Sequence, residues 1–115
     1  MSDLHQLRDA MRQFAHEREW EQFHSPKNLS MALAVEAAEL MEHFQWLTEA
    51  QSLALPAAAK REAAHEMADV LLYLVRLADR LEVDLFAAGL EKMKLNAEKY
   101  PVETSRGSFT KRDAK

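Results

Sequence analysis

Cysteine is absent from this sequence of 115 residues, and glycine and proline are scarce, with two and three copies. The lack of cysteine excludes disulfides, a cysteine nucleophile and a thiolate metal site, and it favours a reducing cytoplasm as the compartment. With so few glycines, a glycine-rich loop that cradles phosphates is not expected. No apolar run approaches the roughly 20 residues that cross a bilayer, so we predict a protein without membrane span or secretion signal.

An excess of positive charge is also missing, since the net charge at pH 7 is −4. Residues 1–91 carry 8 basic and 16 acidic side chains, a charge of −8, whereas residues 92–115 carry 7 and 3, a charge of +4. The acidic body argues against a nucleic acid polymer as partner. The basic C-terminal tail, residues 102–115 with Lys111 and Arg112, is predicted to be either a solvated end or part of a clamp for phosphates.

Hydrophobic periodicity predicts four helices and no strand. The apolar spacing from Leu4 to Phe14 predicts a first helix that runs to about Gln22. Caps and prolines bound the others, with Ser25 and Asp84 as N-caps and Pro101 as a stop, and the expected ranges are about 26–48, 57–81 and 85–100. We therefore predict an all-α four-helix bundle that occupies residues 1–101 as one domain.

Two of these helices place acidic residues beside their apolar stripe. Glu36 falls within the stripe of the second helix and Glu39 lies one step to the side, while Glu66 and Asp69 repeat this pattern on the third. Isolated carboxylates in an apolar layer are costly, so four that converge require cations or bound protons. An all-oxygen ligand set suits Mg²⁺, with Mn²⁺ as a substitute.

Other interpretations of these acidic residues stay open at this stage. They are also compatible with surface glutamates in salt bridges, which would make the protein a non-enzymatic helical adaptor. Glu62-x-x-His65 is typical of di-metal carboxylate redox bundles, although it occurs here only once. His43 lies on the Glu39 side of its helix. It is either a metal ligand or a group on the surface or beside the ligands.

The third helix is apolar nearly all the way round. Its inward stripe runs from Ala59 to Leu81, and a second set of apolar residues lies away from that stripe: Met67, Leu71, Leu72, Val75 and Ala78. A helix of this kind requires burial on two sides. We expect a homo-oligomer that forms through this helix, because four helices alone do not easily cover both sides.

Four segments in order, "EREWEQFHSPKNLSMALAVEAAELMEHFQW", "EMADVLLYL", "KMKLNAEKYP" and "SRGS", resemble the MazG-like all-α nucleotide pyrophosphohydrolases, most closely their dCTP pyrophosphatase branch. The resemblance covers about residues 4–110. It implies cleavage of a (deoxy)nucleoside triphosphate, dCTP or a modified dCTP, to the monophosphate and pyrophosphate. It also implies a tetramer built as a dimer of dimers.

The resemblance further implies a role for individual residues. Glu36, Glu39, Glu66 and Asp69 fall on the Mg²⁺-binding and catalytic carboxylates of the family. Two groups fall on its substrate-binding positions: for the base and sugar, Trp20, Glu21, Gln22, Phe23, His24, Trp46 and Tyr73; near the phosphates, Lys92, Asn96, Lys99 and Tyr100. Met11 departs from the family, because close relatives carry a histidine there. Of the four carboxylates, we choose Glu39 as the base that accepts a proton from the attacking water.

Overall fold

A computed structural model of the protein describes residues 2–108. Every regular element within this range is a helix, so the expected all-α class is confirmed. The chain divides into two compact units, Met1–Val83 and Asp84–Lys115. That residues 1–101 form one domain stays a prediction. Residues 109–115 of the predicted basic tail, Lys111 and Arg112 among them, lie outside the described residues.

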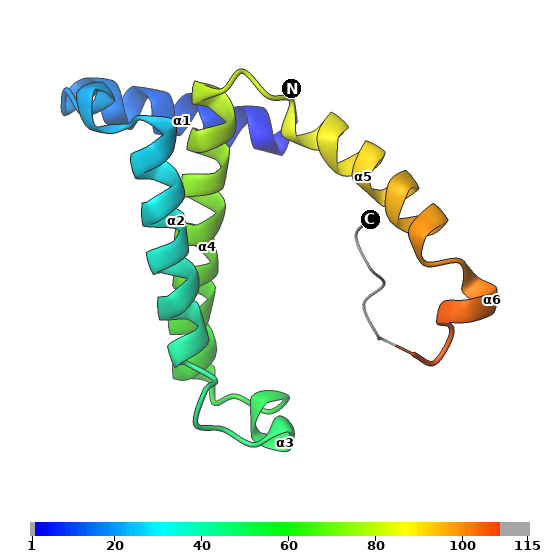
Figure 1. Ribbon diagram of the computed structural model, residues 1–115. Coiled ribbons are helices and arrows are strands. Elements are labelled where there is room, and N and C mark those ends of the chain that lie inside the picture. The colour runs from blue at the N-terminus through cyan, green and yellow to red at the C-terminus, as the bar shows by residue number, and fades with distance from the viewer. Residues whose placement is uncertain (1, 109–115) are drawn as a thin grey trace. The chain divides into compact units, whose positions relative to one another are not determined.

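The first unit is built on an antiparallel pair of helices, α2 and α4, which lie side by side in Figure 1. Helix α1 packs across one end of this pair, against α4. The connections contain two short helical turns. The elements of the unit are α1 (Asp3–Glu17), η1 (Glu21–Phe23), α2 (Pro26–Glu42), α3 (Glu49–Ser52) and α4 (Ala57–Arg80).

Caps begin the helices where the sequence predicts them. The Ser25 hydroxyl accepts a hydrogen bond from the backbone N–H of Asn28, and Pro26 takes the first turn of α2, where its missing N–H costs nothing. Asp84 caps α5 (Leu85–Lys99) in the same way, by accepting from the N–H of Ala87. Two of the four predicted helix starts are therefore confirmed down to the atom that makes the cap.

The first helix is shorter than expected, because it ends at Glu17 and not near Gln22. Glu19 adopts a left-handed backbone conformation (φ 53°), and the Trp20 N–H bonds back to the Ala15 carbonyl at 2.9 Å. Helix α4 ends identically, with Glu82 at φ 56° and a bond from Val83 to Ala78. These are Schellman motifs, which usually carry glycine at the left-handed position. Without that glycine, sequence periodicity overestimates the length of α1.

Helix α2 also ends early, at Glu42, whereas the sequence predicts its end near Thr48. Residues 43–46 form turns, and the short helix α3 follows in the segment that was expected to be a linker. Thr48 and Gln51 make a reciprocal capping box, in which each side chain accepts from the other's backbone N–H. The signal T-x-x-Q was present in the sequence and predicts this helix.

The second face of α4 is covered in part within the chain itself, contrary to expectation. Val75 and Ala78, which the sequence places away from the inward stripe, belong to the buried core, while Leu81 of the predicted stripe is exposed. The physical reason is that α1 packs on α4 in addition to α2. Met67 and Leu71 lie further from the C-terminal end of α4 and stay 51% and 38% exposed.

The second unit contains α5 and the short helix α6 (Val102–Ser105). Helix α5 ends just before Pro101, as predicted, and most of its large apolar side chains are exposed: Phe86, Leu90, Met93 and Leu95. None of the helices in residues 2–108 combines the length and apolar character that crossing a bilayer requires.

Candidate functional site

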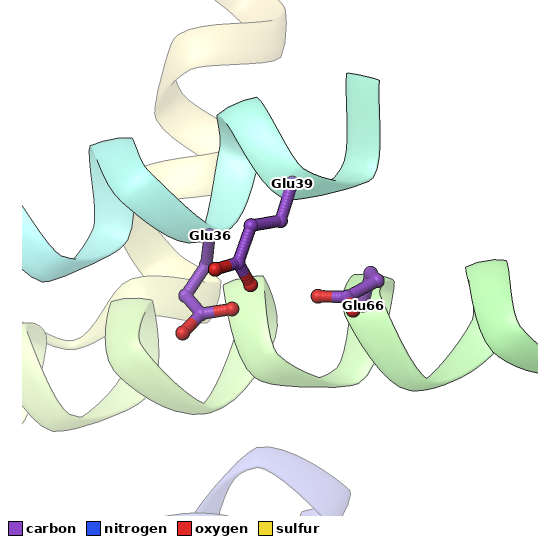
Figure 2. Close-up of side chains that lie close together, drawn as sticks. All are labelled: Glu36, Glu39 and Glu66. Carbon is purple, nitrogen blue, oxygen red and sulfur yellow. The ribbon is translucent and has the colours of Figure 1, made fainter. Parts of the chain in front are cut away.

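Three carboxylates from α2 and α4 converge midway along the helix pair. Glu36 and Glu39 extend from one side of α2 toward Glu66 of α4, as Figure 2 shows. One oxygen from each of these side chains lies within 4.8 Å of the other two. The i, i+3 spacing places both α2 carboxylates on one face, and the antiparallel pairing brings Glu66 opposite them. This spacing of oxygen atoms suits one cation held by all three residues.

The electrostatics of this carboxylate cluster are unfavourable without a cation. Burial raises the pKa of Glu36 to about 7, and the hydrogen bond and charge of Glu39, with the charges of Asp69 and Glu66, act in the same direction. One oxygen each of Glu36 and Glu66, Oε2, is buried without a hydrogen-bond partner. Buried carboxylate oxygens are rarely left unpaired. The donor set therefore fits a hard divalent cation, which would bind these oxygens and remove the repulsion.

The fourth predicted carboxylate, Asp69, lies one turn beyond Glu66 on α4. Its charge acts on Glu36, yet it is not within the group of three whose oxygens lie closest together. His43 is a neighbour of the cluster, with Nε2 at 4.0 Å from Oε1 of Glu66. Glu62 and His65, the residues of the redox-bundle motif, are both exposed. The structure thus brings together three of the four carboxylates that the sequence singled out, and it leaves the residues of the other motif on the surface.

The aromatic segment from Trp20 to His24 lies at the far end of the helix pair from α3 (Figure 1). The rings of Phe14 and Trp20 meet edge to face at 5.6 Å, and those of Trp20 and His24 at 6.1 Å. Glu21, Gln22 and Phe23 form the turn η1. His24 is buried, whereas Phe23 is exposed, so the segment packs against the first unit through His24 and exposes Phe23 to solvent.

Trp46 lies at the opposite end of α2 from Trp20. Helix α2 has 17 residues, which at a rise of 1.5 Å per residue is about 25 Å. The Trp46 side chain is 86% exposed, and Tyr73 is half-buried on α4. The two tryptophans therefore do not share a pocket within one chain, and their common assignment to a base site stays a prediction.

The predicted phosphate-side residues all belong to the second unit. Lys92, Asn96 and Lys99 lie on α5, and Tyr100 is the C-cap of that helix. Lys92 is exposed, and the other three are half-buried. The Lys99 ammonium lies 5.5 Å from the centre of the Tyr100 ring, a cation–π contact. Their role toward phosphates stays a prediction.

A buried ionic network at the aromatic end of the first unit was not predicted from the sequence. Arg76 is only 2% exposed on α4, and it bonds both His24 and Asp79. Asp79 in turn binds Arg12 of α1. The R-x-x-D spacing on a helix signals an i, i+3 ion pair, but the burial of Arg76 depends on how α1 packs, which the sequence does not show.

The family model that matches this sequence is described as the MazG-like family and covers residues 31–111. Similar curated proteins include dCTP pyrophosphatase 1 of Rattus norvegicus and of Homo sapiens, which are 47% and 44% identical over 110 residues. The match covers 94% of this chain but 65% of each relative, so the chain spans less than two thirds of the length of those relatives.

A solved structure also resembles this chain. A pyrophosphatase from Archaeoglobus fulgidus superposes with a TM-score of 0.82 at 37% identity, over 88% of this chain and 94% of that one. The matched region of the family model includes all four predicted carboxylates, three of which form the cluster. Sequence and structure comparisons thus agree, and the chain belongs to the MazG-like family.

Proposed function

We propose that the protein is a nucleoside triphosphate pyrophosphohydrolase that depends on a divalent cation. The single observation that carries this proposal is the carboxylate cluster of Glu36, Glu39 and Glu66, which is incomplete without a cation. Relatives named dCTP pyrophosphatase and a solved pyrophosphatase support the same class of reaction. The reaction cleaves the bond between the α- and β-phosphates and gives a nucleoside monophosphate and pyrophosphate.

Mg²⁺ is the cation proposed for this site, with Mn²⁺ as a substitute, because all candidate ligands are carboxylate oxygens. When bound, the cation supplies neutralisation of the charge on the triphosphate. Glu36 and Glu66 would hold it through the two oxygens that are buried and have no hydrogen-bond partner. Asp69 stands beside this group and contributes negative charge to it.

The remaining chemistry requires a base and an oriented substrate. We assign the base to Glu39, whose carboxylate accepts a proton from the water that attacks the α-phosphorus. The α–β phosphoanhydride bond then breaks, and pyrophosphate leaves with the bridging oxygen. Lys92 and Lys99 of α5 are proposed to bind the phosphates, with Asn96 and Tyr100 beside them.

The proposed substrate is a deoxynucleoside triphosphate, dCTP or a modified dCTP. Trp20 to His24, Trp46 and Tyr73 supply aromatic and polar groups suited to a flat base. Since Trp20 and Trp46 lie at opposite ends of α2, we propose that a second copy of the chain completes the pocket.

We also propose that the chain assembles as a tetramer, a dimer of dimers. Large apolar side chains are exposed on three helices: Met31, Val35 and Met41 of α2, Met67 and Leu71 of α4, and Phe86, Leu90 and Met93 of α5. Monomeric proteins rarely expose so much apolar surface. Absence of cysteine leads us to propose a cytoplasmic location.

Release of pyrophosphate from a panel of dNTPs and NTPs, with Mg²⁺ and with EDTA, tests the proposal. We expect release that requires Mg²⁺, is fastest for cytosine nucleotides, and is lost in Glu36→Gln. The exposed Glu42→Gln on the same helix is the matched control, which should keep full activity. No release from any nucleotide would favour the helical adaptor. Redox turnover with iron or manganese, without pyrophosphate release, would favour the di-metal bundle.

A further inference from the structure

Arg76 is the most deeply buried charged side chain in the described part of the protein, and the carboxylate cluster does not use it. Its Nε donates to Nδ1 of His24 at 3.1 Å, and its Nη1 donates to Oδ2 of Asp79 at 3.3 Å. A buried guanidinium persists only where its charge and its donors find partners. The structure satisfies this condition by pointing one edge of Arg76 at a histidine ring and another at a carboxylate.

Asp79 is held from a second direction by α1. Both Nε and Nη2 of Arg12 donate to its two carboxylate oxygens, a bidentate pair that fixes the position of the carboxylate. Asp79, which Arg12 holds in position, thereby fixes the position of the Arg76 guanidinium. The network joins α1, α4 and the connection that carries His24.

Side chains also hold the backbone of the connection between α1 and α2, which carries His24. Arg80 Nε donates to the carbonyl of His24 at 3.1 Å, and the Asn28 amide donates to the carbonyl of Phe23 at 3.1 Å. The Trp20 ring stands edge to face against the His24 imidazole. The His24 ring thus has a fixed backbone behind it, an aromatic ring beside it and a guanidinium on Nδ1.

Hydrogen-bond chemistry then decides which tautomer His24 adopts. A guanidinium only donates, so Nδ1 must accept and carries no proton. Burial lowers the pKa of His24, the charges of Arg76 and Arg80 lower it further, and Glu21 opposes them more weakly. The ring is therefore neutral, and its single proton sits on Nε2.

The Nε2 atom of His24 is open to a ligand. In residues 2–108, the only buried side-chain nitrogen or oxygen atoms without a partner are Oε2 of Glu36 and Oε2 of Glu66. No hydrogen bond involves His24 Nε2 in this part of the chain. The Arg76 bond occupies Nδ1, so Nε2–H is the hydrogen-bonding group of the His24 ring that is left for a ligand.

We propose that Arg76 is a positioning residue that fixes His24 as a hydrogen-bond donor toward the substrate base. The proposal rests on the proposed function and on the assignment of His24 to the base pocket. An Nε2–H donor matches a carbonyl oxygen or an unprotonated ring nitrogen of a pyrimidine. It repels an exocyclic amino group, which also donates. Arg76 would thereby contribute to base selection without touching the nucleotide.

The direct test is ¹⁵N NMR of the imidazole nitrogens in protein labelled at histidine, with His24 assigned through His24→Asn. We expect His24 to show the Nε2–H tautomer at pH 8 in the wild-type protein. Arg76→Met should replace it with exchange between tautomers and a His24 pKa closer to the ordinary value. This variant leaves Asp79 paired with Arg12, so no buried carboxylate loses its last partner.

The kinetic test compares Arg76→Met with Arg61→Met, an exposed arginine on the same helix. Loss of one oriented hydrogen bond should raise KM for dCTP roughly three- to tenfold, with a smaller change in kcat. The ratio of kcat/KM between dCTP and purine nucleotides should fall by a similar factor. Arg76→Lys, which keeps the charge but lacks the planar fork, should recover part of the loss.

Variants at His24 itself keep the inference testable if Arg76→Met does not fold. Glutamine places an amide N–H near the position of Nε2, whereas asparagine reaches only the position of Nδ1. We therefore expect His24→Gln to raise KM less than His24→Asn does. The inference is overturned if wild-type His24 carries its proton on Nδ1, or if Arg76→Met leaves both its NMR signals and KM like those of Arg61→Met. A wild-type protein that hydrolyses no nucleotide would refute the proposed function, while the NMR result would still decide the tautomer.

Discussion

Neutralising Glu36 should stabilise the metal-free protein and abolish its activity at the same time. The pKa of Glu36 is raised from 4.5 to about 7 by burial and by the neighbouring carboxylates. A tenfold change in proton affinity corresponds to about 1.4 kcal/mol. The charged form of Glu36 therefore lowers the free energy of unfolding by about 3 kcal/mol at most, and Glu36→Gln should recover much of this.

The sign of the pH dependence follows from proton binding. The folded protein holds the Glu36 proton more tightly than the unfolded chain does, so this residue destabilises the fold only where it is ionised. Below pH 4.5, Glu36 is protonated in both the folded and the unfolded state and does not destabilise the fold. The destabilisation grows as the pH rises and is complete above about pH 7. Glu36→Gln removes this dependence, so the two proteins should differ most at pH 8.

Urea unfolding followed by circular dichroism, at pH 5 and pH 8 in EDTA and at one protein concentration, measures the effect. Wild-type protein should lose stability between these pH values, and Glu36→Gln should lose less. Mg²⁺ should stabilise the wild type and have little effect on the variant. Glu42→Gln, an exposed neighbour on α2, is the control and should behave as wild type. Equal stability of Glu36→Gln and wild type at pH 8, or full pyrophosphate release by the variant, would refute the reasoning.

Four further predictions concern the base, the assembly, the buried ion pair and a helix end. Trp46→Ala should raise KM for dCTP roughly ten- to hundredfold with a smaller fall in kcat, because one stacked base is worth about 1–3 kcal/mol; a loss of kcat alone would show that Trp46 positions the chemistry. Analytical ultracentrifugation at micromolar concentration should give the mass of a tetramer, and a monomer would contradict the proposed assembly. Asp79→Ala should lower the free energy of unfolding by about 3 kcal/mol at pH 7, because it removes the only carboxylate bonded to the buried Arg76 within the described residues. A loss below about 1 kcal/mol would show that Arg76 stays buried without this carboxylate. The bond from Arg12 lowers the pKa of Asp79 below 3.8, so this contribution is present above about pH 4 and is lost as the pH falls further. Glu82→Gly should raise the free energy of unfolding by up to about 1 kcal/mol by relieving a positive φ, and a decrease would mean that the Glu82 side chain stabilises the end of α4.

Most helix starts, and the residues that carry charge into the apolar layer, could be predicted from the sequence alone. Caps such as Ser25 and Asp84 act through backbone groups two to three residues away, so their effect is local and visible in the sequence. The i, i+3 spacing of Glu36 and Glu39 is local in the same sense. The segments that resemble the MazG-like family are also sufficient to indicate the correct family.

Which of these residues come into contact depends on how the helices pack against one another. That Glu66, and not Asp69, completes a group of three carboxylates with Glu36 and Glu39 depends on the register of α4 against α2, which no periodicity fixes. The burial of Val75, Ala78 and Arg76 depends on α1 packing on α4, and the early end of α1 depends on a left-handed Glu19. Interactions within one helical turn can be read from the sequence, whereas contacts between helices reflect the combined packing of many side chains from distant segments.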